Sequence, residues 1–363
     1  HLQNWLQVFM QRSKKTKHRN REYNGPFEIL EIKDNSTVEN TKRIVIKVGS
    51  SLLFNEETKK LNKEWLISLA EDVNFLKNKN KEVIIVSSGA IAFGAKDLNL
   101  EMNELRLDIH QALAAIGQIQ LMSAFKTAFE KYESKVSQIL LTLDDTEKRR
   151  RSINARRTID NLLKLNIVPV VNENDTIATN EIKYGDNDRL AARVAQITGA
   201  DCLILLSNIN GLYSSDPKNN QELKLIDSVE SIDETIERMA GSSISETGKG
   251  GMKTKIMAAK TALSAGCHMA ITNGTVNNPI QALFNGRPCT WFTPNKTPLA
   301  ARKQWIVGTM QTVGSVIIDD GANEALINGS SLLPAGILNV RGEFERGDAI
   351  EILSSDKKKI GIG

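Results

Sequence analysis

Short, continuously apolar runs alternate along most of the chain with segments in which apolar residues recur every three or four positions. A short apolar run predicts a buried strand, and a period near 3.6 predicts an amphipathic helix. Strands that alternate with such helices indicate a parallel sheet covered on both faces. We therefore expect a three-layer α/β/α sandwich with a mainly parallel central sheet at residues 43–292. The predicted strands are 43–48, 82–87, 136–142, 167–172, 202–207 and 268–272, and the predicted helices are 61–78, 110–132, 152–165, 188–198 and 252–265.

The pattern changes after residue 292. The segment TPNKTP contains two prolines and predicts a linker, which we place at residues 293–306. Beyond it, short strand patterns at 313–318, 337–340 and 348–353 are separated by glycine-containing turns, and no long helical pattern intervenes. This predicts a small β-rich domain at residues 307–363. We expect that domain to be incomplete at its C-terminal end.

Residues 1–42 form a basic extension. The net charge of the chain is +4, but the first 21 residues hold six basic and no acidic side chains, so the remainder has a net charge of −2. Leu2, Trp5, Leu6 and Phe9 recur at helical spacing ahead of the basic tract. The extension is therefore predicted to be disordered or to be an organelle-targeting segment. The acidic balance of the rest does not favour binding to nucleic acid.

Membrane and metal classes find no support in the sequence. No apolar run approaches the ~20 residues that a membrane-spanning helix needs. Cys202, Cys267 and Cys289 form no CxxC pair, so a structural zinc site or a disulfide framework is not predicted. We expect buried or incidental thiols, a reducing compartment, a cytoplasmic location and no dedicated protein metal site.

Candidate chemistry gathers in five polar clusters. Familiar nucleotide motifs are absent, since the sequence has no GxxxxGK[ST] and no GxGxxG after a strand. Each cluster instead ends a predicted strand or opens a predicted helix, and in a parallel sheet those positions meet at one edge. The clusters are KVGSS at 47–51, SSGA at 87–90, NEND at 172–175, GDND at 185–188 and GKGGMKTK at 248–255.

These clusters suit the binding of anions and of an amino group. Lys47 and Lys255 could reach one transferring phosphoryl group from opposite sides, and phosphoryl transfer depends on such cations and on Mg²⁺. Ser88 precedes a helix start, which favours an anion. Plainer interpretations remain open for single clusters: a solvated lysine, a serine that caps a helix, turns rich in Asn and Asp, and a flexible basic loop.

Taken in order, the clusters resemble the amino acid kinase family, and in particular its glutamate-phosphorylating members. The resemblance covers roughly residues 43–363, and the segment SSLLPAGILNVRGEFERGDAI looks like the PUA domain appended to bacterial-type members. The matching segments are KVGSSLL, VSSGAIAFG, VPVVNENDTIATNEIKYGDNDRLAA, LLSNINGLYSSDP and GKGGMKTKIMAA. The combination of NEND, GDND and GGMxTK is more specific than any single segment.

The resemblance implies a role for each matched residue. Lys47 and Lys255 would neutralise the transferring phosphoryl group, and Asp188 would orient these two lysines. Ser88, Asp175 and Asn187 would bind L-glutamate. The implied ATP site comprises Lys47, Ser207, Asn208, Lys249, Gly250, Gly251, Met252, Lys253, Thr254 and Lys255.

The implied reaction is ATP-dependent phosphorylation of the γ-carboxylate of L-glutamate to γ-glutamyl phosphate, with Mg²⁺, at the start of proline biosynthesis. Two departures from the family pattern, Asn208 and Lys249, each add one positive charge beside the nucleotide and bear on its binding. We also expect a homo-oligomer and hold proline as a candidate feedback inhibitor. The alternatives are an aspartate- or acetylglutamate-type kinase of the same family and a non-catalytic, RNA-binding PUA protein.

Overall fold

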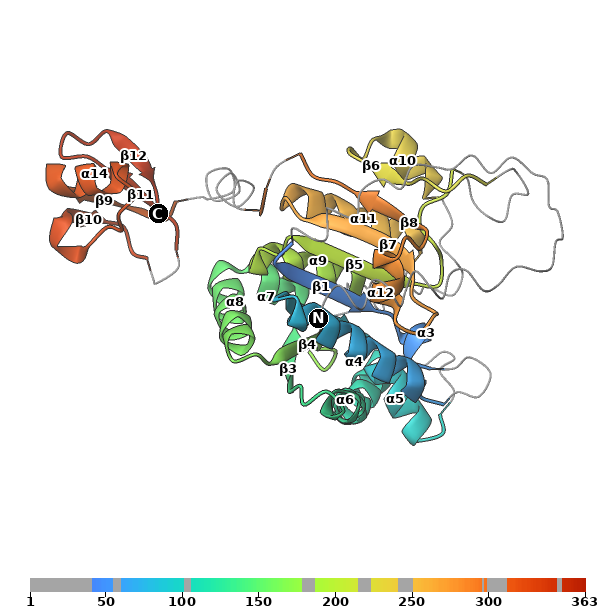
Figure 1. The fold of residues 1–363 in the computed structure, drawn as a ribbon. Coiled ribbons are helices and arrows are strands. Elements are labelled where there is room, and N and C mark those ends of the chain that lie inside the picture. The colour runs from blue at the N-terminus through green and yellow to red at the C-terminus, as the bar shows by residue number, and fades with distance from the viewer. Residues whose placement is uncertain are drawn as a thin grey trace, which may run out of the picture. The chain divides into compact units, whose positions relative to one another are not determined.

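The computed structural model describes residues 41–54, 60–100, 106–177, 187–214, 223–240, 251–295, 297–298, 312–344 and 348–363. Residues 1–40 of the predicted extension and most of the predicted linker lie outside these ranges. The described part contains a large sheet and a small sheet (Figure 1).

The large sheet has eight strands in the order β3-β4-β2-β1-β5-β7-β8-β6. Every neighbouring pair is parallel except β7 and β8, which are antiparallel, so the predicted mainly parallel sheet is confirmed. Its strands are β1 (Arg43–Val48), β2 (Glu82–Ser87), β3 (Val136–Leu141), β4 (Val168–Glu173), β5 (Cys202–Ser207), β6 (Ser228–Val229), β7 (His268–Asn273) and β8 (Cys289–Phe292).

Successive residues of each strand point to opposite faces of the sheet, so the sheet has two apolar faces. Helices connect the strands and bury both faces. In β1, Ile44 and Ile46 enter one hydrophobic core and Val45 enters the other. The helices of this part are α3 (Ser50–Leu53), α4 (Lys63–Asn78), α5 (Ala90–Asp97), α6 (Leu107–Glu130), α7 (Leu143–Glu147), α8 (Arg149–Lys164), α9 (Asn187–Thr198), α10 (Glu234–Met239), α11 (Met252–Ser264) and α12 (Pro279–Phe284).

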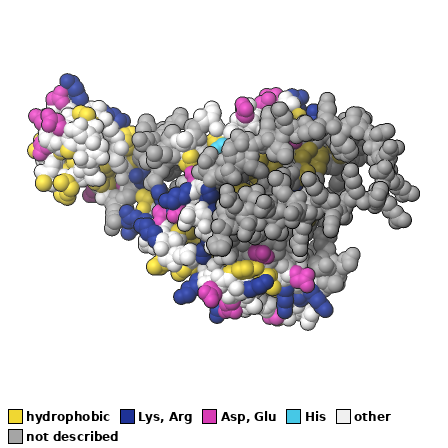
Figure 2. Space-filling model, in the orientation of Figure 1, with side chains coloured by type: hydrophobic (Ala, Val, Ile, Leu, Met, Phe, Trp, Pro, Cys, Tyr) yellow, Lys and Arg dark blue, Asp and Glu magenta, His cyan; other side chains and the backbone are white. Residues whose placement is uncertain are grey.

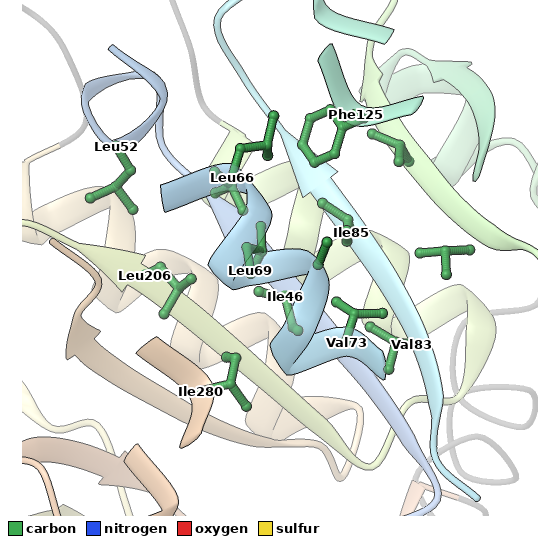
Figure 3. Close-up of a cluster of buried hydrophobic side chains, with 14 of the residues drawn as sticks. Ile46, Leu52, Leu66, Leu69, Val73, Val83, Ile85, Phe125, Leu206 and Ile280 are labelled. Atoms are coloured by element: carbon green, nitrogen blue, oxygen red, sulfur yellow. The ribbon is translucent and has the colours of Figure 1, made fainter. Parts of the chain in front are cut away.

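One core lies beneath α4. In Figure 3, Leu66, Leu69 and Val73 of this helix lie over Ile46 of β1 and Ile85 of β2, and Phe125 of α6 closes the cluster. The second core joins the other face of the sheet to α8, α9 and α11. Each face is therefore covered, which gives the predicted α/β/α sandwich.

The small unit holds four strands in the order β10-β9-β11-β12. The β9–β11 pair is parallel and the other two pairs are antiparallel. Its elements are β9 (Gly314–Ile318), α14 (Asp320–Ile327), the short 3₁₀ helix η2 (Pro334–Gly336), β10 (Ile337–Arg341), β11 (Ile350–Leu353) and β12 (Lys359–Ile362). The predicted β-rich second unit without a long helix is confirmed.

Basic side chains gather over α8 on the face shown in Figure 2. Several of them pair with neighbouring acids: Arg151 lies 3.0 Å from Asp145, and Arg156 lies 3.4 Å from Asp160. This surface is therefore partly neutralised. Separately, none of the described helices combines the length and the apolar character required to cross a membrane.

Candidate active site

Predicted polar clusters meet at one edge of the large sheet. The strands β4, β2, β1 and β5 are neighbours and run in parallel, so their carboxyl ends lie side by side. Lys47, one residue before the end of β1, is level with Leu205 of β5. Ser87 ends β2 opposite Val48. The first two residues of the NEND segment end β4.

Two lysines share one buried carboxylate at this edge. Lys47 Nζ lies 2.6 Å from Asp188 Oδ1, and Lys255 Nζ lies 3.0 Å from Asp188 Oδ2. Asp188 stands in the first turn of α9 and Lys255 in the first turn of α11, so the ends of two helices bring the groups together. The exposed fractions are 2% for Asp188, 5% for Lys255 and 9% for Lys47. Thr254 Oγ1 also donates a hydrogen bond of 3.2 Å to Asp188 Oδ2.

Asp188 keeps its negative charge throughout the neutral range. Burial by itself would raise the pKa of this carboxyl, because an ion is less stable away from water. The positive charges of Lys47 and Lys255 outweigh burial and lower the pKa of Asp188 to about 2. These three groups together carry a net charge of +1, so they favour an anion beside them.

The start of α5 opens onto the same edge. Gly89 precedes the helix with a φ of +112°, a backbone conformation that residues other than glycine rarely adopt. Ser88 does not cap the helix, since its Oγ donates to the carbonyl oxygen of Val48 at 3.2 Å. Within the described residues, no side chain caps α5. Its first N–H groups and the helix dipole therefore suit a carboxylate or phosphate.

Asp175 lies in the turn that follows β4. Burial raises the pKa of this carboxyl to about 6. A cation placed beside it would lower that pKa again, because it would stabilise the charged form. Asp175 is thus suited to hold an ammonium group. Gly185 and Asp186 of the GDND segment lie outside the described residues.

A second set of polar groups links α9 to β4 and α6. Asn187 Nδ2 donates to Asn172 Oδ1 at 3.4 Å, and Asn172 Nδ2 donates to Gln118 Oε1 at 2.8 Å. Asn187 Oδ1 is buried and has no hydrogen-bond partner among the described residues. Gln118 is not among the site residues predicted from the sequence. The only signal for it was a polar residue beside Gly117, on the face by which α6 packs.

On the other side of β1, the end of β5 and the start of α11 come next. Ser207 ends β5, and its Oγ lies 3.4 Å from Asn208 Oδ1. Gly251 precedes α11, and no described side chain caps this helix. The strand end and the helix start thus offer hydroxyl, amide and backbone N–H groups to an anionic ligand.

A cavity of about 730 Å³ lies between α10 and α11. Lys253 and Met257 of α11 line it, together with Glu234 of α10. Glu234 was not among the predicted site residues, because its local sequence contains no recognisable motif. Lys249 and Gly250, which we predicted to bind the nucleotide, lie outside the described residues.

Comparisons with known proteins agree with the observed fold. The profile of the amino acid kinase family matches residues 42–273, and that of the PUA domain matches residues 314–363. Among solved structures, the carbamate kinase from Giardia lamblia bound to AMP-PNP has a TM-score of 0.50 and 14% identity. The match covers 71% of this chain and 100% of that one, and it shows a shared fold.

The chain belongs to the amino acid kinase family. It is 55% identical over 326 residues to the glutamate 5-kinase of Pelagibacter ubique (strain HTCC1062), which covers 90% of this chain and 88% of that protein. It is 51% identical over 322 residues to the glutamate 5-kinase of Ruegeria sp. (strain TM1040), with coverages of 89% and 87%. Within the family, these relatives place it among the glutamate 5-kinases.

Proposed function

We propose that this chain transfers the γ-phosphoryl group of ATP to the γ-carboxylate of L-glutamate, giving ADP and γ-glutamyl phosphate for proline biosynthesis. The observation that carries the proposal is the pair Lys47 and Lys255 held on Asp188 at the sheet edge. A structural ion pair needs only one lysine for one carboxylate. The name shared by the most similar relatives supports glutamate as the acceptor.

Phosphoryl transfer requires positive charge around the transferring oxygens, and little covalent help from the protein. Lys47 and Lys255 supply that charge, one from β1 and one from α11. Asp188 keeps the two ammonium groups in place before the substrate arrives, so no reorganisation is needed during the reaction. Asp188 itself takes no proton, because its pKa lies far below neutrality.

Glutamate would bind on the β4 side of Lys47. The start of α5, with Ser88, receives a carboxylate through backbone N–H groups. Asp175 and the Oδ1 atom of Asn187 accept hydrogen bonds from the α-ammonium group. N–H groups that donate to a carboxylate and oxygens that accept from an ammonium group then lie on either side of the substrate, which fits an amino acid.

ATP would bind on the β5 side, at Ser207, Asn208 and the segment 249–255. The start of α11 faces the phosphates, and Lys253 borders the cavity between α10 and α11. Mg²⁺ would accompany ATP on the phosphate oxygens, where it neutralises charge. Both oxygens of Asp188 already hold ammonium groups, so this carboxylate serves the lysines.

We further propose that the protein works in the cytoplasm as a homo-oligomer and that proline inhibits it by feedback. The three thiols are free, and Cys202 and Cys267 are buried, which suits a reducing compartment. We do not expect nucleic acid as a partner, because the chain outside its basic extension is net acidic. The boundaries at 43–292, 293–306 and 307–363 stay predictions.

A coupled assay of ADP release with glutamate, aspartate and acetylglutamate tests the proposed reaction. We expect release with glutamate alone, together with a hydroxylamine-trapped γ-glutamyl product. Release with another acceptor and not with glutamate would assign a different substrate. A folded chain that releases no ADP with any acceptor would refute the assignment to a kinase.

A further inference from the structure

Four side-chain amides form a hydrogen-bonded series that runs from the proposed glutamate site to β3, the outermost strand at one side of the large sheet. Asn187 donates to Asn172, and Asn172 donates to Gln118. Gln118 Nε2 then donates to Gln138 Oε1 of β3 at 3.3 Å. Asn172, Asn187 and Gln118 are nearly buried, with exposed fractions of 2%, 4% and 8%, whereas Gln138 is exposed.

A backbone group fixes the direction of this series. The N–H of Glu173 donates to Asn172 Oδ1 at 2.9 Å, and a backbone N–H can only donate. Asn172 therefore has its oxygen toward Glu173 and Asn187, and its Nδ2 toward Gln118. Asn187 must present its nitrogen to Asn172, which leaves its Oδ1 for another group. That oxygen is buried and has no hydrogen-bond partner among the described residues.

Gln118 also belongs to a rigid support. Its neighbour Gly117 packs directly on the first turn of α5, where a Cβ at residue 117 would lie 1.8 Å from the carbonyl oxygen of Ala90. The helix α6 thus contacts the start of α5 through residue 117 and Asn172 through residue 118. The two halves of the proposed glutamate site are held by adjacent residues of one helix.

We propose that Gln118 is a positioning residue for the amino-acid substrate. Its Oε1 holds the Nδ2 of Asn172, so that Asn187 offers a carbonyl oxygen, and not an amide nitrogen, to the substrate ammonium group. Gln118 touches no substrate and acts through the two asparagines. This inference rests on the proposed function, since it deepens the role of the same site.

The test uses the full chain and the isosteric replacement Gln118→Met. Removing the acceptor for Asn172 should raise KM for glutamate about 3- to 10-fold, the effect of one buried hydrogen bond, with KM for ATP unchanged. The matched control is Gln120→Met, the same change on the same helix at a position outside the series. It should leave both constants unchanged. A rise in both KM values with Gln118→Met would indicate a general structural role and overturn the proposal.

A double-mutant cycle with Asn187→Ala separates positioning from packing. If Gln118 acts through Asn187, Gln118→Met should change KM for glutamate less than about twofold once Asn187 is alanine. If the two substitutions instead change KM for glutamate by independent factors that multiply in the double variant, the proposal is overturned. If the wild-type chain itself shows no glutamate-dependent ADP release, the proposed function is refuted. The failure of the proposed function and the failure of this inference are therefore distinguishable.

Gln118→Glu keeps an acceptor for Asn172 and covers the case in which the methionine variant does not fold. Its KM for glutamate should stay within about threefold of the wild-type value, because a carboxylate accepts the same hydrogen bond. If Gln118→Glu folds but its KM for glutamate rises by more than about tenfold, with KM for ATP unchanged, the hydrogen-bond acceptor at residue 118 does not position the substrate.

Discussion

Two aspartates near the carboxyl ends of the strands have opposite ionisation behaviour, and the difference follows from their neighbours. Both are desolvated, which by itself raises the pKa of a carboxyl. Asp188 has two lysines in contact, and its pKa falls to about 2. Asp175 has no such compensation, and its pKa rises to about 6. One carboxylate is thus permanently charged, while the other responds to a cationic ligand.

Replacing either lysine of the site should slow the chemical step. We expect Lys47→Ala and Lys255→Ala each to lower kcat by roughly 10²–10³-fold, because their charge matters most where negative charge develops. KM for glutamate should change much less. Steady-state kinetics with both substrates varied provides the measurement.

Lys126→Ala is the control for the lysine variants, because this side chain is exposed on α6, where it lies 3.9 Å from Glu130. It should behave as the wild type, since surface ion pairs contribute little. Near-normal kcat in a Lys47 or Lys255 variant would show that the assignment of that lysine is wrong.

Glutamate binding should weaken in acid because Asp175 gains a proton. Its pKa in the folded chain is raised to about 6, so the neutral form predominates below about pH 6. The stability that this shift contributes to the folded chain is fully present below about pH 4 and is lost as the pH rises through about 6. Above pH 6 the charged form awaits a cation. KM for glutamate should therefore be constant above pH 7 and rise about tenfold by pH 5, where roughly one site in ten is ionised.

Asp175→Asn should raise KM for glutamate at pH 8 and remove most of its dependence on pH, while KM for ATP stays the same. Asp188 does not interfere, because the stability it contributes is present above about pH 4 and is lost only toward pH 2. An asparagine variant with the same pH profile as the wild type would place the titrating group elsewhere.

At the scale of elements, the hydrophobic pattern was enough to predict the central strands and the large helices. Continuous apolar runs predicted β1, β2 and β5 at their observed bounds. The helix expected at 110–132 is α6, which spans Leu107–Glu130. The short strand β8, Cys289–Phe292, was not predicted.

The site could be predicted only where its residues stand at strand or helix ends. Parallel strands bring such ends to one edge, so the approach of Lys47 to Lys255 follows from topology. Gln118 could not be found this way, because it lies in the middle of a helix. Its contact with Asn172 joins residues 54 positions apart and depends on how α6 packs.

The close contact of α5 and α6 gives a prediction at this scale. Gly117→Ala would place a Cβ 1.8 Å from the Ala90 carbonyl oxygen and 2.4 Å from Gly94 N, both backbone atoms that cannot rotate away. The helices must separate, and we expect the free energy of unfolding to fall by about 1–3 kcal/mol. Denaturant unfolding measures this change.

The same Gly117→Ala variant should raise KM for glutamate, because the start of α5 moves with the helix. Ser123→Ala introduces the same side chain at an exposed position of α6 and should leave stability and KM nearly unchanged. If Gly117→Ala is as stable as the wild type, the helices do not pack as closely as the structure shows.

At the scale of the whole molecule, the large unit has its hydrophobic cores to itself. Every residue of both core clusters lies between Ile44 and Phe292. The five polar clusters also precede residue 293. The small unit has a sheet of its own and matches the PUA domain. Both cores and all five polar clusters therefore precede the small unit.

The charge of the small unit argues against a role in RNA binding. Residues 307–363 hold eight acidic and five basic side chains, a net charge of −3. Three of the five bases, Lys357, Lys358 and Lys359, are adjacent, and the last two lie within 2.8 Å of Asp356 and Glu351 respectively. Affinity for RNA depends largely on neutralising phosphates, and an acidic surface does not provide this.

We therefore expect a chain that ends at Pro298 to keep glutamate-dependent ADP release, with kcat within a few-fold of the full chain. Both cores and all described site residues remain in it. Size-exclusion chromatography accompanies the kinetics and reports any change in assembly. A chain lacking residues 1–21 should bind RNA weakly or not at all in a filter assay at 50 and 200 mM salt. A folded shortened chain without activity, or tight RNA binding that weakens steeply with salt, would show that the small unit takes part in the function.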